Sequence, residues 1–477
     1  MRRVLAIVAV LVFAVSCTSG TVETTDVPVT MSLAPPTTLP FLPGSVGIGD
    51  EYYPTLGNGG YDVQRYDLDV IYGTNGDVTI EAVITAVAEM NLSRFNLDFA
   101  GWEIDQLEID GVATDYERGD TELVVDHVRI ASGTEFEVGV TYRGVPEPIQ
   151  SQALPFPLGW FSGPEDEQFV VAQPDGAHAW FPNNDHPLDK ATFAFQITVP
   201  SGFVAAANGE LTDVTENGAT TTYSWDMDDP MASYLATVII GETWAIVDDV
   251  ASTDTSGIPI RNVLPPDLTE DAHEALAKTG EMMTLLEESF GPYPFDEYGI
   301  AVVGGFEHAL ENQTLSVFGR TMVDRPYFEY VLVHELAHQW FGDSVSVAQW
   351  SDIWLNEGFA TFAELLWVEH LYGPAAYREE VANRKDAALT GEYGPPGTPS
   401  PRDLFNRTVY QRGSFVLVAL RNEVGDDAFF EILQAHAARH ANGNVTTDEF
   451  IALAEEISGR DLASLFDTWL YGEEMPK

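Results

Sequence analysis

The sequence predicts a multidomain β plus α protein, with an N-terminal all-β sandwich or saddle-like curved sheet followed by a mainly helical domain. Period-two alternation of apolar and polar residues dominates the first half, and helical spacing dominates the second. The chain has 477 residues, of which 45% are hydrophobic, so it can bury more than one core. We expect a leader at 1–16, a tether at 17–47, the β domain at 48–248 and the helical domain at 249–477.

Short alternating segments fill the first half of the chain. Turn residues such as Asn75-Gly76 and Asn217-Gly218 separate them. Alternation turns one face of each strand toward a core and the other toward solvent. The expected strands lie near residues 61–70, 79–84, 121–130, 135–142 and 192–199.

After Pro265-Pro266 the apolar residues recur at helical spacing. Phe290-Gly291-Pro292 ends the first of these segments, and Gly373-Pro374 separates two later ones. We expect helices near 268–290, 327–341, 353–371, 409–424, 427–440 and 446–470, with short strands at 298–303 and 314–318.

The N-terminus has the features of an export signal. Arg2 and Arg3 precede an apolar run, Val4 to Val15, that is shorter than the ~20 residues needed to span a bilayer. The end of this run resembles a bacterial lipobox, so Cys17 is the predicted lipidation site, with a plain secretory signal as the alternative. A Thr-, Ser- and Pro-rich tether follows. We therefore expect an exported bacterial protein, either secreted or anchored by lipid to the outer face of a membrane.

Acidic residues greatly outnumber basic ones. There are 75 Asp and Glu against 22 Lys and Arg, a formal net charge of -53. Such a surface repels phosphate backbones, so no nucleic-acid partner is expected. A single cysteine excludes an intrachain disulfide framework. Charging of this kind is also typical of salt-adapted proteins, in which salt screens self-repulsion, and it indicates a saline habitat.

The strongest functional signal is the segment His334-Glu335-Leu336-Ala337-His338. Two histidines four positions apart on a helix share one face and can bind one cation, while the intervening glutamate polarises a bound water. Two surface histidines on an ordinary helix are the alternative, but the apolar flanks indicate a buried helix. Glu357 follows His338 after 18 residues, inside another apolar segment, and a buried carboxylate needs a cation. We expect one Zn²⁺ on His334, His338 and Glu357, with Glu335 as general base.

The segment HELAHQWFG, followed by the glutamate of WLNEGFA, resembles the gluzincin metalloaminopeptidases of the aminopeptidase N type, whose pattern is HExxH-x18-E. The similarity extends over nearly all of residues 60 to 475. It implies a thermolysin-like catalytic domain behind the β domain. It also implies zinc-dependent hydrolysis of the first residue from peptides with a free N-terminus. The chain looks like a short form without the C-terminal helical domain of larger members, and we expect a monomer.

The same resemblance assigns further roles. His308-Ala309-Leu310-Glu311-Asn312 occupies the place of the family's Gly-x-Met-Glu-Asn, whose glutamate binds the substrate N-terminus, so that role falls on Glu311. His308 and Leu310 depart from the family's glycine and methionine, which bears on specificity. Gln173 matches a residue that reaches from the β domain into the cleft. Tyr410 matches the tyrosine that hydrogen-bonds the tetrahedral intermediate. The predicted substrate-binding set is Gln173, His308, Ala309, Leu310, Glu311 and Asn312, and the predicted catalytic residues are Glu335 and Tyr410.

Two other functions are compatible with the motif. One is an inactive surface lipoprotein that binds zinc or peptides, and the other is a thermolysin-like endopeptidase. Retention of Glu311, Glu335 and Tyr410 favours an active enzyme. N-acetylated peptides separate the two peptidase classes, because only an aminopeptidase needs a free amino terminus.

Overall fold

The fold is known from a computed structural model that describes residues 39–73, 75–242, 244–248, 257–388 and 394–476. Cys17, the predicted leader and most of the predicted tether lie outside these residues. Residues from Phe41 onward form one folded unit. Two residues assigned to the tether by composition belong to this unit as strand β1 (Leu42–Pro43), which pairs in parallel with β4 (Leu92–Asp98).

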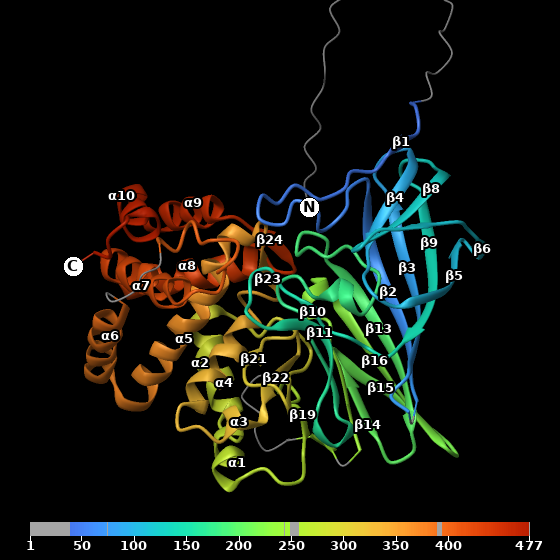
Figure 1. Ribbon diagram of the computed structural model, residues 1–477. Helices are drawn as coiled ribbons and strands as arrows, with labels where there is room; N and C mark the ends of the chain where they lie inside the picture. The colour runs from blue at the N-terminus through green and yellow to red at the C-terminus, as the bar shows by residue number, and fades with distance from the viewer. Residues whose placement is uncertain (1–38, 74, 243, 249–256, 389–393, 477) are drawn as a thin grey trace, which may run out of the picture. The chain divides into compact units, whose positions relative to one another are not determined.

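Two facing sheets build the N-terminal β domain (Figure 1). Tyr61 on the larger sheet packs against Phe95 on the smaller one, with ring centroids 5.8 Å apart, and Phe95 in turn packs 5.5 Å from Phe136. The smaller sheet has the order β1, β4, β8 (Glu122–Ile130), β7 (Glu117–Arg118). The larger sheet has the order β15 (Glu210–Asn217), β16 (Thr220–Met231), β13 (Ala191–Pro200), β2 (Tyr61–Tyr72), β3 (Val78–Ala88), β9 (Glu135–Gly144), β5 (Glu103–Ile109), β6 (Val112–Ala113).

The alternation seen in the sequence is the reason for this packing. In β3 every second residue is fully buried, and the residues between them are partly or fully exposed. This confirms the prediction of an N-terminal β-rich domain. This half of the chain also forms a third sheet. Its strand order is β10 (Ile149–Gln150), β11 (Pro157–Ser162), β12 (Gln168–Val171), β17 (Val238–Gly241), β14 (Val204–Ala207).

The second half combines one mixed sheet with a set of helices, as predicted (Figure 1). The sheet has the order β18 (Ala245–Asp248), β19 (Arg261–Leu264), β20 (Gly299–Val303), β22 (Leu315–Gly319), β21 (Ala309–Leu310). A short pair, β23 (Val345–Val347) and β24 (Gly443–Val445), lies apart from it. The helices are α1 (Glu270–Leu276), α2 (Thr279–Phe290), α3 (Arg320–Val323), α4 (Phe328–His338), α5 (Trp354–Tyr372), α6 (Pro374–Ala388), α7 (Arg407–Val424), α8 (Asp426–Arg439), α9 (Thr447–Ser458), α10 (Ala463–Phe466).

The short helix α3 was not expected, and the structure differs from the expected helices in three further places. The segment 268–290 is two helices, because the chain turns at Ala277-Lys278 and Thr279 Oγ1 donates to the Leu276 carbonyl. The segment 446–470 breaks after Ser458, where Gly459 adopts a left-handed conformation with φ 65° and ends α9. Helix α6 was not predicted, since its largely polar sequence lacks a clear apolar stripe; Pro374 is its first residue.

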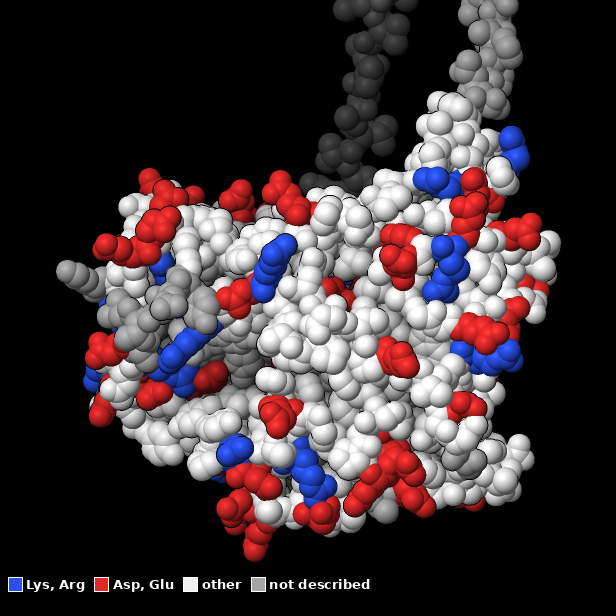
Figure 2. Space-filling view, in the orientation of Figure 1, with Lys and Arg blue, Asp and Glu red and all other residues white. Residues whose placement is uncertain are grey.

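No helix in the described part of the chain combines the length and the apolar character needed to cross a membrane. Acidic side chains are spread over the face shown in Figure 2 rather than gathered in one patch, and Lys and Arg are fewer. This face therefore has the general negative charge that the composition predicts.

Candidate active site

Helices α4 and α5 bring the three predicted metal ligands together. His334 and His338 lie one turn apart on α4, and Glu357 lies in the first turn of α5. Oε2 of Glu357 is 3.4 Å from Nε2 of each imidazole, and all three side chains are buried. In a tetrahedral zinc site with bonds of about 2.0–2.2 Å, two ligand atoms lie about 3.4 Å apart. The three side chains therefore fit a single Zn²⁺ ion.

The charge of Glu357 also suits a metal ligand. Burial raises the pKa of this carboxyl, but the neighbouring His338 and His334 outweigh burial and lower the pKa to about 2. Glu357 is therefore an anion, and two imidazoles with one carboxylate form the ligand set of many catalytic zinc sites.

Contacts on the far side of each imidazole fix its orientation. Nδ1 of His338 lies 3.1 Å from the Phe341 carbonyl oxygen, and Nδ1 of His334 lies 3.0 Å from Oε1 of Glu364. Glu364 in turn accepts a 2.6 Å hydrogen bond from Arg384 on α6. Such partners hold the ring in place and leave Nε2 free for a cation.

Sequence reasoning missed Glu364 and Arg384. Glu364 lies seven positions after Glu357, two turns along the same helix, so helical periodicity could have found it. Nothing in the sequence links Arg384 to the site, because its helix shows no apolar face and lies 20 residues further along the chain.

Glu335 lies beside the ligands without being one of the closest three. A carboxylate oxygen of Glu335, one of Glu311 and a ring nitrogen of His338 all lie within 4.8 Å of one another. Burial raises the pKa of Glu335 to about 7; His334 and His338 partly oppose this effect, whereas Glu311 adds to it. The structure thus brings Glu335 and Glu311 to the same point next to the metal ligands.

Glu311 closes one end of this site. It follows strand β21 and is 2% exposed. Gln173, from the segment after β12 in the β domain, donates a hydrogen bond from Nε2 to Oε1 of Glu311. The Glu311 carbonyl accepts a 3.1 Å hydrogen bond from Gln339, directly after α4. Gln173 and Gln339 come from segments far apart in the sequence, and both hold Glu311 beside the metal ligands. The Gln173 side chain adds an amide at the same place.

The other residues of the 308–312 segment have different surroundings. Asn312 is fully buried and donates a 2.8 Å hydrogen bond to the Leu235 carbonyl, so it ties the segment to the β domain. Ala309 and Leu310 form β21 and pair with β22. The ring of His308 stacks on Phe156, with centroids 4.6 Å apart.

Tyr410 reaches the site from α7. Its ring lies roughly parallel to that of His334, with centroids 6.0 Å apart. Burial, with the nearby Glu357 and Glu311 carboxylates, raises the pKa of Tyr410 well above its ordinary value, so the phenol keeps its proton. A close crossing of α5 and α7 at Gly358 and Gly413 sets this position. A Cβ added at Gly358 would lie only 2.8 Å from the Gly413 carbonyl carbon.

Polar contacts from the β domain hold two segments of the helical half, one shortly after α4 and one shortly after Glu311. Lys190 donates 2.7 and 3.0 Å hydrogen bonds to the carbonyls of Asp343 and Ser344. Asn208 donates a 2.7 Å hydrogen bond to the Gln313 carbonyl, two residues after Glu311. These contacts position the catalytic half against the β domain.

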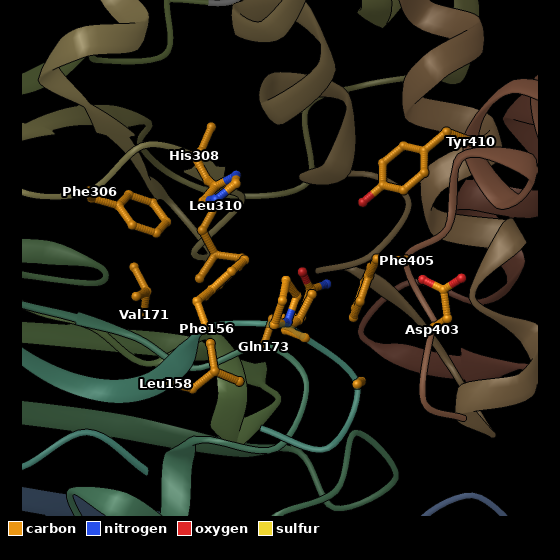
Figure 3. Close-up of a pocket in the computed structure, with 14 residues that line it drawn as sticks. Phe156, Leu158, Val171, Gln173, Phe306, His308, Leu310, Asp403, Phe405 and Tyr410 are labelled. Carbon is orange, nitrogen blue, oxygen red and sulfur yellow. The ribbon is translucent and has the colours of Figure 1, made fainter. Parts of the chain in front are cut away.

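A pocket of about 370 Å³ opens next to these groups (Figure 3). Gln173, Leu310 and Tyr410 lie in its wall, so it adjoins both Glu311 and the metal ligands. Phe156 and Leu158 from the β domain face Phe306 and His308 from the catalytic half. The arrangement offers a metal site, a buried base, a carboxylate–amide pair and a mainly apolar recess.

Profile comparisons match two parts of the chain. Residues 158–235 match the Peptidase M1 N-terminal domain, and residues 274–469 match the Peptidase family M1 domain. Aminopeptidase N of Streptomyces lividans is 30% identical over 333 residues, covering 64% of this chain and 38% of the relative. Aminopeptidase M1 of Arabidopsis thaliana is 26% identical over 328 residues, with coverage of 64% and 37%. The chain thus spans little more than a third of these relatives.

Solved structures match over almost their whole length. The M1 zinc metallopeptidase of Deinococcus radiodurans has a TM-score of 0.81 and 31% identity, and the match covers 90% of this chain and 98% of that one. A variant of the same peptidase bound to a Tyr-Ser-Ala substrate gives a TM-score of 0.82 at 30% identity, with coverage of 90% and 99%. The chain is therefore similar to this peptidase in fold, in two-domain arrangement and in sequence.

Proposed function

Because the chain belongs to peptidase family M1, we propose that it is a zinc-dependent aminopeptidase that hydrolyses the N-terminal residue from peptides. The observation that carries this proposal is the placement of the buried Glu311–Gln173 pair next to His338 and Glu335. A metal-activated hydrolytic site closed on one side by the Glu311 carboxyl group and the Gln173 amide oxygen favours a substrate that presents a free ammonium group there.

One Zn²⁺ ion held by His334, His338 and Glu357 supplies a Lewis acid and lowers the pKa of a bound water. Glu364, on the far side of His334, keeps that imidazole in the required orientation. The protein's part is thus to fix three ligands and leave a position open.

The remaining groups then have separate tasks. Glu335 takes a proton from the attacking water and later delivers it to the leaving amine. The protonated phenol of Tyr410 donates a hydrogen bond to the developing oxyanion. Glu311 and Gln173 accept hydrogen bonds from the substrate ammonium, so that the first peptide bond is the one presented to the base.

The closed side distinguishes this proposal from a thermolysin-like endopeptidase. An endopeptidase must accept chain on both sides of the scissile bond, whereas Glu311 is 2% exposed and held from two directions. N-acetylation removes the ammonium charge, so acetylated peptides should be cleaved at least about 100-fold more slowly. Equal cleavage of free and acetylated peptides would favour the endopeptidase.

Substitution Glu335→Gln tests the mechanism and separates it from an inactive binding protein. We expect release of aminoacyl fluorophores to fall by about 100-fold or more while one zinc per chain remains bound. Glu329→Gln, on the same helix and paired with Lys278, is the matched control and should keep activity. Full activity in zinc-loaded Glu335→Gln would overturn the proposed base, and a wild-type protein without chelator-sensitive activity would favour the binding protein.

We also propose that the protein is exported, lipidated at Cys17 and monomeric. The cationic start, the apolar run and the lipobox-like segment support export and lipidation. Labelling cells with a palmitate analogue should mark the wild type but not Cys17→Ser. Light scattering of purified protein measures the oligomeric state, and a dimer mass would refute the monomer.

A further inference from the structure

The outer wall of the pocket is a stack of rings that joins the two halves of the protein. Phe156, from the segment between β10 and β11, stacks on His308, with centroids 4.6 Å apart and planes 17° apart. His308 also meets the edge of Phe306 at 5.7 Å. Phe306 continues the row to the buried Phe169, 6.0 Å away. His308 is exposed and Phe156 is partly exposed, and the row of rings connects them to the buried Phe306 and Phe169.

The pocket that this wall encloses is mainly apolar. Its volume is about 370 Å³. Ten of its lining residues are apolar: Ala153, Leu154, Pro155, Phe156, Leu158, Val171, Phe306, Ala309, Leu310 and Phe405. A small side chain of a bound ligand would leave most of the apolar pocket surface in contact with water, whereas a large apolar side chain would cover it.

Few charged side chains line the pocket. Asp403 is the one carboxylate among the lining residues, and its side chain is exposed to solvent. His308 is itself exposed, but its partial desolvation lowers the pKa of the ring, although Glu307 partly opposes this effect. A basic side chain placed in the pocket would lose hydration against a wall without a buried counter-charge, and an exposed carboxylate offsets little of that loss.

The pocket adjoins the groups that would hold a substrate amino terminus. Gln173 lines it and donates to Glu311, while Tyr410 lines it on the side of the metal ligands. Figure 3 places Gln173 and Tyr410 in the wall of this pocket. A peptide with its ammonium at Glu311 and its first carbonyl near Tyr410 would therefore present its first side chain to the pocket.

We propose that the His308–Phe156 stack is the specificity wall of this pocket and selects substrates with a large apolar first side chain, such as Leu, Met or Phe. This inference rests on the proposed aminopeptidase function. Covering the pocket with such a side chain should raise kcat/KM over that for an alanyl substrate by roughly 10- to 100-fold. Lysyl and arginyl substrates should fall below leucyl ones.

Leucyl, phenylalanyl, alanyl and arginyl amides of one fluorophore, tested with the zinc-loaded enzyme, measure this preference. His308→Ala and Phe156→Ala should each lower the phenylalanyl-to-alanyl ratio by about threefold or more, because each removes one partner of the stack. The double variant should lower the ratio by about as much as either single change does, because each single change already removes the stack. His308→Phe keeps a ring in the stack and should retain the ratio.

His370→Ala is the matched control. His370 stacks on Trp367 with centroids 5.3 Å apart, outside the pocket, so its removal should leave the ratio unchanged. Calorimetric titration with free L-phenylalanine and L-alanine adds a readout that needs no turnover. We expect tighter binding of L-phenylalanine in the wild type and a smaller difference in His308→Ala.

The outcomes separate the two proposals. A flat substrate preference, or a preference unchanged in both alanine variants, overturns the specificity wall while leaving the aminopeptidase intact. No cleavage of any amide, together with a wall-dependent preference for L-phenylalanine in calorimetry, overturns the proposed function and keeps the wall. Equal binding of the two amino acids overturns the wall in either case.

Discussion

Substitution Gly358→Ala should impair catalysis without touching a catalytic side chain. Gly358 on α5 follows the metal ligand Glu357, and it faces Gly413 on α7, three residues after Tyr410. An added Cβ would lie 2.8 Å from the Gly413 carbonyl carbon and 3.0 Å from its Cα. These atoms are backbone, so no flexible side chain can move aside. The two helices must separate.

The size of the effect follows from these distances. Carbon atoms pack at about 3.5–4.0 Å, so the helices must part by about 1 Å. Tyr410 moves with α7 while the ligands stay with α4 and α5, and a misplacement of about 1 Å can cost about 100-fold in rate. Overpacking lowers the free energy of unfolding by about 1–3 kcal/mol, and alanine's better helix propensity offsets about 1 kcal/mol of this loss. Activity should therefore fall far more than stability.

The assay compares kcat/KM, bound zinc and the urea midpoint of unfolding for the wild type and Gly358→Ala. Gly394→Ala is the control, because a Cβ there would meet no atom within 4 Å. We expect kcat to fall by about 100-fold with zinc retained. If kcat/KM stayed within about threefold of the wild type, the close crossing would not be what positions Tyr410, and the reasoning would fail.

Three further predictions concern the metal, pH and salt. Arg384→Met should weaken zinc binding by about 10- to 100-fold in chelator competition, because Glu364 then loses the partner that fixes it against His334; unchanged affinity would remove Arg384 from the site. His436 is fully buried, and burial, with His440, lowers its pKa to about 3. Between pH 3 and 6.5 the unfolded chain therefore binds one more proton at this residue. The free energy of unfolding should fall by about 1.4 kcal/mol per pH unit below pH 6.5, a slope that His436→Phe should reduce in urea titrations at pH 7 and 5. The thermal midpoint should rise with added NaCl because salt screens the net charge of -53; a midpoint that stays flat would contradict salt adaptation.

The metal ligands could be predicted because their signal is local. His334 and His338 are placed on one face by helical periodicity alone, and the apolar flanks of Glu357 indicate its burial. The structure places all three within reach of one ion. The helix breaks at Ala277-Lys278 and Gly459 were missed, because apolar spacing continues through both and a single turn decides each of them.

Residue types and their spacing determined the chemistry of this protein: two imidazoles and a base at helical spacing, a carboxylate as the third metal ligand, an acid-rich surface, and a β half followed by a helical half. Only the tertiary structure decided what surrounds that chemistry. Gln173 meets Glu311 across 138 positions, and Phe156 stacks on His308 across more than 150. Periodicity reports which face of an element is buried, but not which distant element covers it. That choice depends on how whole sheets and helices pack, and it sets the closed end of the cleft and the shape of its pocket.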